Sequence, residues 1–298
     1  MRFDFMDLDI VKIIQLMRNP ILDWFFYIVT QIGDQYFFIA IVAIIYWTVS
    51  KKYAHKFAFT FMLTAGLNTG IKEIVKRFRP YYQNGVTVED HWMTEGYSFP
   101  SGHSQAAGVL GYLAYDVSKK LSKKWIWYVG IAVLILVPLS RVYLGQHYLS
   151  DVVVGAALSF TLAIFIFKLV DKMKDNEHIY TIMLAPIFIL VLFFVQNHDI
   201  FVAAGGFTGF AVGYYLEKEY VKYDVKADLW IQIVKILIGL VFAIAIKEGL
   251  KFILPYSLTE ETDPTILDLI LDFIRYFMIG AWAAYGAPLV FKYVFRHK

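Results

Sequence analysis

Long apolar stretches recur along almost the whole chain of 298 residues, and they restrict its fold more than any other feature. Because 59% of the residues are hydrophobic and 18% are aromatic, the composition is far from that of a soluble domain. Several stretches are shorter than the roughly 20 residues that span a hydrocarbon core, so amphipathic ends must complete them. The sequence predicts a polytopic membrane protein with nine candidate helices, at residues 36–49, 57–71, 105–117, 125–139, 152–170, 179–195, 200–216, 229–246 and 266–294.

The N-terminal segment does not form a clean apolar span. Lys12, Arg18 and Asp23 interrupt an otherwise apolar run, and the pair Asn19-Pro20 breaks its helical pattern. We therefore expect an interfacial amphipathic helix over residues 7–18, followed by a short helix that enters the membrane.

Lysine and arginine residues mark one side of the predicted membrane protein. They gather in alternate connections, and cytoplasmic loops of membrane proteins are rich in them. We therefore expect these connections and the C-terminus to be cytoplasmic, while residues 79–103 and 140–150 face outward. The cationic side consists of Lys51, Lys52, Lys56, Lys119, Lys120, Lys123, Lys124, Lys172, Lys174, Lys218, Lys222, Lys226, Lys292, Arg296 and Lys298.

Charge and cysteine content exclude several classes of function. The net charge of +3 is small and is mostly explained by the cationic loops, so no nucleic-acid partner is predicted. Cysteine is absent, which excludes disulfides and thiolate zinc sites. The outward-facing part must therefore be held together by helix packing alone.

The segment KEIVKRFRP, residues 72–80, holds the first cluster of polar residues. Lys72 and Arg79 are about two helical turns apart, so on a helix they share one face at its outward end. Pro80 would then end this helix. For Lys76 and Arg77 the simpler interpretation is snorkelling of their charges to the membrane boundary. Lys72 and Arg79 fit that interpretation less well, because bulk positive charge belongs on the other side.

The second cluster is PSGH, residues 100–103, directly before an apolar helix. A Ser-Gly turn at the start of a helix presents unpaired backbone N–H groups beside a hydroxyl. The positive end of the helix dipole lies behind them, which favours an anion such as phosphate. The alternative is that Ser101 only caps the helix.

The third cluster is SRVYLGQHYLSD, residues 140–151. Arg141 offers a planar fork of donors that suits phosphate oxygens. His147 and Asp151 stand four positions apart and share a face if a helix begins nearby. A carboxylate there can hold one imidazole nitrogen and leave the other as a nucleophile. Alone, the pair is also compatible with a structural hydrogen bond, but all three clusters fall on one membrane face.

Together the three clusters resemble the motifs of the type 2 phosphatidic acid phosphatases, which are relatives of the vanadium haloperoxidases and of glucose-6-phosphatase. The resemblance covers roughly residues 20–170. All three motifs are complete and stand in the family's order. The pattern K-x6-R-P corresponds to Lys72, Arg79 and Pro80, the pattern P-S-G-H to residues 100–103, and the pattern S-R-x5-H-x3-D to Ser140, Arg141, His147 and Asp151.

This resemblance implies an all-α membrane fold with a six-helix phosphatase core. We expect the core, with its N-terminal interfacial helix, over residues 1–175, and about four additional transmembrane helices over residues 176–298. The site would lie on the extracytoplasmic side of the cell membrane.

The resemblance also implies a role for each motif residue. His147 attacks phosphorus and forms a phosphohistidine, while Asp151 fixes its tautomer. His103 protonates the departing oxygen and then activates water. The oxygens of the phosphoryl group would be held by Lys72, Arg79, Ser101, Gly102 and Arg141. No metal or other cofactor is expected, because carboxylates are too sparse in the clusters to form a magnesium site.

A lipid phosphate is the expected substrate, because at the membrane boundary a headgroup reaches the site while its tail stays in hydrocarbon. Undecaprenyl pyrophosphate, phosphatidylglycerol phosphate and phosphatidic acid are the candidates, and the motifs do not rank them. One alternative is a phosphotransferase of the same family, in which another hydroxyl replaces water. A less favoured alternative is a transporter, which the number of helices and the intramembrane charges would suit.

The C-terminal part contains two further patterns. Gly205, Gly209 and Gly213 recur every four residues, which lets another helix approach closely. We expect this face to pack on the core or on a second copy of the chain, giving a homodimer through the C-terminal helices. The segment IKEGLKFILP, residues 246–255, partly repeats residues 71–80, but Leu254 stands in the position equivalent to Arg79. We interpret it as chance or a degenerate relic and not as a second phosphate site.

Overall fold

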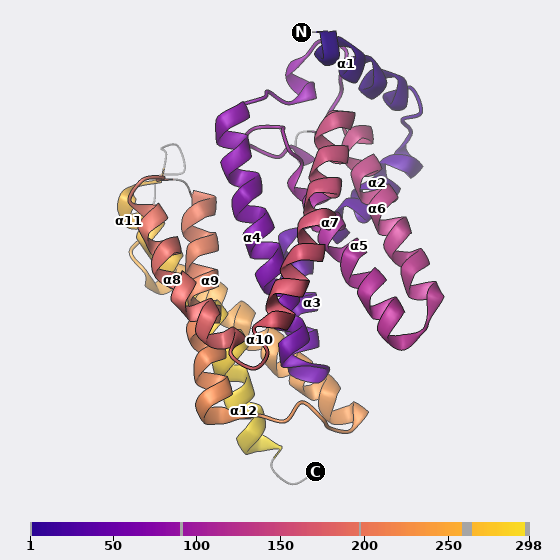
Figure 1. Ribbon diagram of the computed structural model, residues 1–298. Coiled ribbons are helices and arrows are strands. Elements are labelled where there is room, and N and C mark those ends of the chain that lie inside the picture. The colour runs from indigo at the N-terminus through magenta and orange to yellow at the C-terminus, as the bar shows by residue number, and fades with distance from the viewer. Residues whose placement is uncertain (1, 90–91, 197, 258–263, 296–298) are drawn as a thin grey trace. The chain divides into compact units, whose positions relative to one another are not determined.

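The computed structural model describes residues 2–89, 92–196, 198–257 and 264–295, and throughout these ranges the regular elements are helices (Figure 1). The predicted all-α fold is confirmed. The helices are α1 (Arg2–Gln15), α2 (Pro20–Thr30), α3 (Gln35–Thr48), α4 (Lys51–Val75), α5 (Gly102–Leu121), α6 (Lys124–Tyr143), α7 (Leu149–Lys172), α8 (Glu177–Leu192), α9 (His198–Leu216), α10 (Leu229–Ile253), α11 (Ile266–Ala281) and α12 (Ala287–Val294). Short 3-10 turns follow α2 at Gln31–Gly33 and stand at Pro80–Tyr82, and π-helical turns follow α9 and α11.

Four helices are long and apolar enough to cross a membrane by length and composition. They are α6, α7, α10 and the segment 200–221 that contains most of α9. A fifth span is formed if α2 and α3, which are bent by 50° at their break, count as one. This number, found within the described ranges, is smaller than the nine stretches marked in the sequence. Polar residues lower the hydropathy of α4, for example, which begins with two lysines.

The chain divides into two compact units that are not continuous in sequence. Unit 1 contains residues up to 39 together with residues 63–168, and unit 2 contains residues 40–62 together with residues 169–298. The predicted domain boundary near residue 175 stays a prediction. Of the residues on the predicted cationic side, Arg296 and Lys298 lie outside the described ranges.

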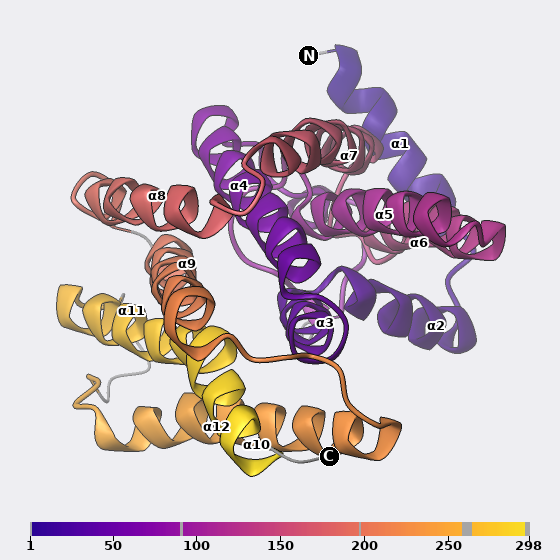
Figure 2. The same cartoon turned by 60° about the horizontal axis from the view of Figure 1, so that its bottom comes forward.

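Unit 1 is built around the antiparallel pair α5 and α6, against which α1 and α2 also pack (Figure 2). Asn19 accepts hydrogen bonds from the backbone N–H groups of Ile21 and Leu22 and so begins α2, with Pro20 at its first position. The start of α1 at Arg2 is earlier than the residue 7 that the sequence suggested, and its end at Gln15 is earlier than residue 18.

In unit 2, α9 lies between α8 and α11 (Figure 2). A Cβ atom on Gly205 would lie 2.3 Å from the carbonyl oxygen of Phe273, and one on Gly209 would lie 2.0 Å from that of Phe277. The glycine face of α9 is thus covered by α11 of the same chain. This corrects the expectation that the face packs on the motif-bearing core or on a second copy, while a homodimer through the C-terminal helices stays a prediction.

We expect Gly209→Ala to destabilise the protein by about 2–3 kcal/mol, since the added methyl would overlap backbone and the helices would have to separate. Gly206→Ala is the matched control, because a Cβ atom at Gly206 meets nothing within 4 Å and alanine favours helix. The measurement is the midpoint of thermal unfolding in detergent. Equal midpoints for the two variants would contradict this account of the α9–α11 contact.

The apparent repeat near the end of α10 differs from the first motif in the surroundings of its lysine. Lys247 forms an ion pair with its neighbour Glu248 at 3.3 Å, so a carboxylate already accompanies the cation. The chain leaves the helix at Leu254, which is apolar where the first repeat has a cation.

Candidate active site

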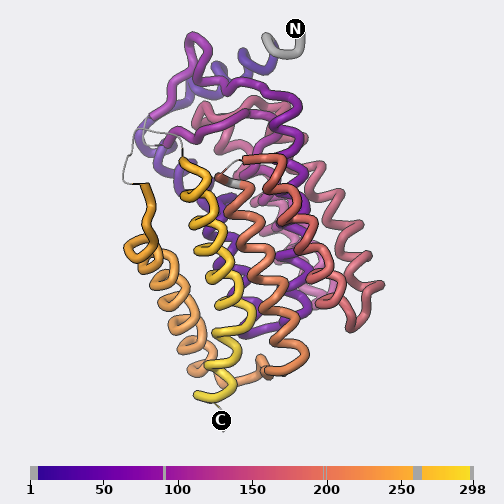
Figure 3. The backbone as a smooth tube through the Cα atoms, turned by 90° about the vertical axis from the view of Figure 1, so that its left-hand side faces the viewer, coloured from indigo at the N-terminus to yellow at the C-terminus, as the bar shows by residue number. Residues whose placement is uncertain are grey.

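Side chains from four separate segments meet at one end of unit 1. These segments are the end of α4 with its following connection, the start of α5, the end of α6 and the start of α7. Figure 3 shows α1 and the α4–α5 connection at this same end. The backbone itself joins two of the segments, because the N–H of Ser101 donates to the carbonyl oxygen of Asp151 at 3.1 Å.

The first motif is not one continuous helix, which corrects the sequence interpretation. Helix α4 ends at Val75, and Lys76 has a left-handed backbone with φ of 49°. Arg79 is extended, with φ of −76° and ψ of 156°, as expected for a residue before proline. Lys72 and Arg79 therefore do not share a helix face. Pro80 begins a 3-10 turn and does not end the helix.

Arg79 nevertheless reaches the third motif and is buried there. One terminal nitrogen, Nη1, donates to the carbonyl oxygen of Gln146 at 3.1 Å and lies 3.1 Å from Nε2 of His147. The rest of its guanidinium donates to the carbonyl oxygens of Glu95 and Gly96 at 2.7 and 2.8 Å. Arg79 is thus fixed beside the imidazole by the α4–α5 connection.

Arg141, near the end of α6, is 3% exposed. Its two terminal nitrogens donate to the hydroxyls of Thr30 and Thr94 at 3.0 and 3.2 Å. Its Nε is buried without a hydrogen-bond partner. A buried donor left unsatisfied costs free energy, and an anion oxygen would satisfy it.

Lys72 and the start of α5 complete the cationic side of the site. The ammonium group of Lys72 donates to the carbonyl oxygen of Tyr97. Ser101 is the N-cap of α5, and its hydroxyl accepts from the backbone N–H of Ser104 at 3.3 Å. Ser101 therefore caps α5, and its part in holding phosphate stays a prediction. Gly102 follows as the first helical residue, where backbone N–H groups and the helix dipole favour an anion.

His147 precedes α7, and its two ring nitrogens have different surroundings. Nδ1 lies 3.5 Å from Oδ2 of Asp151 and 3.3 Å from the hydroxyl of Ser98. Because the Ser98 hydroxyl donates to Asp151, Nδ1 must be the protonated nitrogen of a neutral ring. Nε2 faces a guanidinium donor and therefore carries the lone pair.

Burial lowers the pKa of His147 well below its usual range, and the positive charges of Arg79, Arg141 and Lys72 lower it further. A neutral imidazole is therefore the form held between these groups at neutral pH. Burial also lowers the pKa of His103, at the start of α5, and the charges of Arg141, His147 and Arg79 act in the same direction. The charges of Arg79 and Arg141 thus lower the pKa of both motif histidines.

Two contributors were not identified from the sequence. Ser98 bridges His147 and Asp151, and Arg77 donates to Oδ1 of Asp151 at 2.8 Å. The snorkelling interpretation is therefore wrong for Arg77, whereas the Lys76 side chain is exposed. The local pattern gives no sign that Arg77 meets Asp151, because this ion pair joins residues that are 74 positions apart in the sequence.

The chain matches two family models and several curated proteins. Residues 53–175 match the model of the PAP2 superfamily, and residues 201–296 match the model of the PAP2 superfamily phosphatase transmembrane extension. The chain is 35% identical to phosphatidylglycerophosphatase B of Bacillus subtilis over 114 residues, which is 36% of this chain and 53% of that protein. It is 26% identical to undecaprenyl-diphosphatase of Sulfolobus acidocaldarius over 153 residues, or 50% of this chain and 71% of that protein.

A solved structure is also similar to the chain. It is the first transmembrane PAP2 type phosphatidylglycerolphosphate phosphatase from Bacillus subtilis, with a TM-score of 0.50 and 27% sequence identity over 58% of this chain and 88% of that one. The matched part amounts to about half the length of the curated relative from the same organism. These matches to two models of one superfamily, over residues 53–175 and 201–296, show that the chain belongs to the PAP2 superfamily.

Proposed function

We propose that this protein is a membrane phosphatase that hydrolyses a lipid phosphate or diphosphate through a phosphohistidine at His147. One observation carries the proposal: the neutral ring of His147 has its Nδ1 held by Asp151 and Ser98, while Nε2 faces the cations. A nucleophile that attacks a phosphate dianion needs this arrangement, since the lone pair must point to where cations hold the substrate.

In the first step Nε2 of His147 attacks phosphorus, an N–P bond forms and the bond to the leaving oxygen breaks. His103, which takes up a proton when the bound phosphate dianion offsets the neighbouring positive charges, gives that proton to the leaving oxygen. In the second step His103 takes a proton from water, whose oxygen attacks phosphorus and breaks the N–P bond. Phosphate leaves, and both histidines return to their initial states. Asp151 stabilises the positive charge that develops on the ring of His147 during attack.

The cationic groups would stabilise the charge spread over the three equatorial oxygens. Arg141 has an unsatisfied Nε, and Arg79 and Lys72 donate to backbone carbonyls that a phosphate oxygen can replace. Replacing a neutral acceptor by an anionic one strengthens these hydrogen bonds, which favours substrate entry. The Ser101 hydroxyl and the N–H of Gly102 would add neutral donors. Because these groups supply the positive charge, we expect EDTA to leave activity unchanged.

The substrate class is supported by the relatives and by the composition of the helices. Two relatives are named for phosphatidylglycerophosphate and undecaprenyl diphosphate, and both of these are lipids that carry a terminal phosphoryl group. The site stands at the ends of α6 and α7, both of which are apolar enough to span a membrane. We place it on the extracytoplasmic side, because the cationic loops belong to the opposite helix ends.

A screen of phosphate release tests the function. Purified protein in detergent is given phosphatidylglycerophosphate, phosphatidic acid and a polyprenyl diphosphate, with and without EDTA. Release of inorganic phosphate from at least one of them is expected, whereas a transporter would release none. Transfer of the phosphoryl group to an added alcohol, with little free phosphate, would indicate the phosphotransferase instead.

The pH dependence of kcat/KM should reflect the lowered pKa of His147. A histidine whose pKa lies below its usual range stays neutral, and therefore nucleophilic, as pH falls through about 6.5. We expect the acidic limb of kcat/KM to lie well below that pH, after correction for ionisation of the substrate phosphate. An acidic limb near or above 6.5, measured between about pH 4 and 9, would contradict the assignment.

A further inference from the structure

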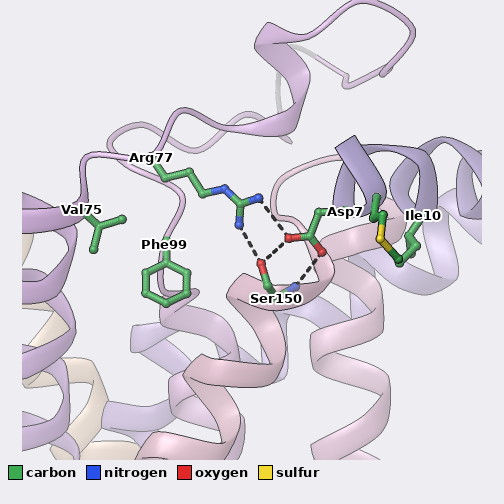
Figure 4. Close-up of a pocket in the computed structure, with 7 residues that line it drawn as sticks. Asp7, Ile10, Val75, Arg77, Phe99 and Ser150 are labelled. Atoms are coloured by element: carbon green, nitrogen blue, oxygen red, sulfur yellow. Dashed lines mark hydrogen bonds and ion pairs between the residues drawn. The ribbon is translucent and has the colours of Figure 1, made fainter. Parts of the chain in front are cut away.

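Helix α1 lies before the region that matches the PAP2 model, yet it contacts the catalytic segment directly. Asp7 of α1 accepts a hydrogen bond from the backbone N–H of Ser150 at 3.2 Å and another from the hydroxyl of Ser150. It also forms an ion pair with Arg77 at 3.0 Å. Figure 4 shows Arg77, Asp7 and Ser150 converging from three different segments.

Arg77 is fixed by charged, polar and aromatic contacts at once. Its Nη1 donates to Ser150 at 2.7 Å and to Asp151 at 2.8 Å, while Nη2 donates to Asp7. The guanidinium lies over the ring of Tyr148, with 3.8 Å between its central carbon and the ring centroid. Such a fork can hold only one orientation, unlike the flexible ammonium group of lysine.

The surroundings of this pair are apolar and strengthen it. A hollow of about 410 Å³ adjoins Arg77, Asp7 and Ser150, and its remaining wall consists of Met6, Ile10, Val75 and Phe99 (Figure 4). The side chains of Arg77 and Asp7 are 17% and 12% exposed. Ion pairs gain strength as water is excluded, so the bridge orients its partners more firmly than an exposed pair would.

Asp151 divides its two oxygens between Arg77 and the nucleophile. Oδ1 accepts from Arg77, while Oδ2 accepts from Ser98 and from the N–H of Tyr148 at 2.9 Å and faces Nδ1 of His147. The carboxylate is fully buried. Arg77 therefore prevents rotation of the carboxylate and keeps Oδ2 directed at the histidine.

We propose that Arg77 and Asp7 are positioning residues that act on catalysis through Asp151. Arg77 holds the carboxylate, and Asp7 holds Arg77 and balances part of its charge. Without Asp7, the positive charge of Arg77 would be less balanced. It would then offset more of the negative charge that Asp151 presents to His147. This inference rests on the proposed function of His147 as nucleophile.

The first test compares the effects of substitutions on kcat and on KM for phosphate release. Arg77→Gln should lower kcat by about 10- to 100-fold, as loss of an outer hydrogen-bond partner typically does, and Asp7→Asn should lower it less. KM should stay within about twofold of wild type, because neither residue belongs to the groups proposed to bind phosphate. Arg77→Lys should restore part of the lost kcat, since it keeps the charge but not the fork.

Matched controls separate the bridge from general charge effects. Lys76→Gln removes the same charge one residue away, and Asp9→Asn does so two residues from Asp7; both side chains are exposed. Both controls should keep wild-type kcat. If they lose as much kcat as Arg77→Gln and Asp7→Asn, the bridge has no special role and the proposal is overturned.

A double-mutant cycle then tests the route through Asp151. In an Asp151→Asn background, Arg77→Gln should change kcat less than about twofold, because the group it positions is already lost. A further tenfold loss would show that Arg77 acts elsewhere and would overturn the proposal. Failure of the function itself looks different: His147→Ala would then be active. With His147→Ala inactive and Arg77→Gln at wild-type kcat, only the positioning role fails.

Discussion

His147→Ala is expected to lower the rate of phosphate release by about four to six orders of magnitude, as removal of a covalent nucleophile does in other enzymes. The variant loses the one side-chain atom proposed to bond to phosphorus. Water would have to attack phosphorus directly, and the cations are not positioned to support attack by water from that place. The remaining rate would come from charge stabilisation and substrate binding alone.

The measurement is kcat for purified wild-type and variant protein in the same detergent, with His198→Ala as control. His198 belongs to unit 2, is half exposed and pairs with Asp272 at 3.2 Å, so its loss should leave kcat unchanged. Wild-type protein is also quenched during turnover of a ³²P-labelled lipid. A radioactive label on the protein that is labile in acid and stable in base would identify the phosphohistidine. Near wild-type turnover by His147→Ala would reject the nucleophile assignment.

The helical membrane fold could be predicted because apolar stretches in lipid have few alternatives to helix. The predicted helices were too short, because polar residues extend the helices beyond the apolar stretches. The stretch at 105–117 lies inside α5, Gly102–Leu121, and the stretch at 57–71 lies inside α4, Lys51–Val75. Residues 40–62 join the C-terminal helices in one unit, which no local pattern indicates.

The motif residues could be identified from sequence, but their local geometry could not. Residue spacing suggested a helix from Lys72 to Arg79, whereas the chain leaves the helix at Val75. That departure lets Arg77 and Arg79 approach Asp151 and His147 from the same connection. Spacing also suggested a direct contact between His147 and Asp151, and the folded chain adds Ser98 between them, from a segment about fifty residues earlier.

The role of Asp7 could not be predicted from the sequence either. Its charge and the charge of Asp9 are equivalent in the sequence pattern of α1, and only the packed structure distinguishes them. Asp7 meets Arg77 and Ser150, while the side chain of Asp9 is exposed. Long-range ion pairs depend on which faces of two elements meet, and one sequence does not contain that information.

His103→Ala should lower kcat by about 10²- to 10⁴-fold for substrates that release an alcohol, because positioned proton transfer contributes that much. A lipid alkoxide is a poor leaving group, and its departure requires a proton from His103. A nitrophenolate leaves as a stable anion. So does the lipid monophosphate that is released when the terminal phosphorus of a lipid diphosphate is attacked. For those substrates the loss in the first step should be much smaller.

The comparison is therefore the ratio of wild-type to variant kcat for phosphatidic acid and for para-nitrophenyl phosphate, with the burst phase measured to isolate the first step. His147→Ala is the matched control, since loss of the nucleophile should affect both substrates alike. An equal loss for both substrates in His103→Ala would mean that His103 binds phosphate and does not transfer the proton. The roles of the two motif histidines would then have to be assigned differently, with the leaving oxygen protonated by water or by another group of the site.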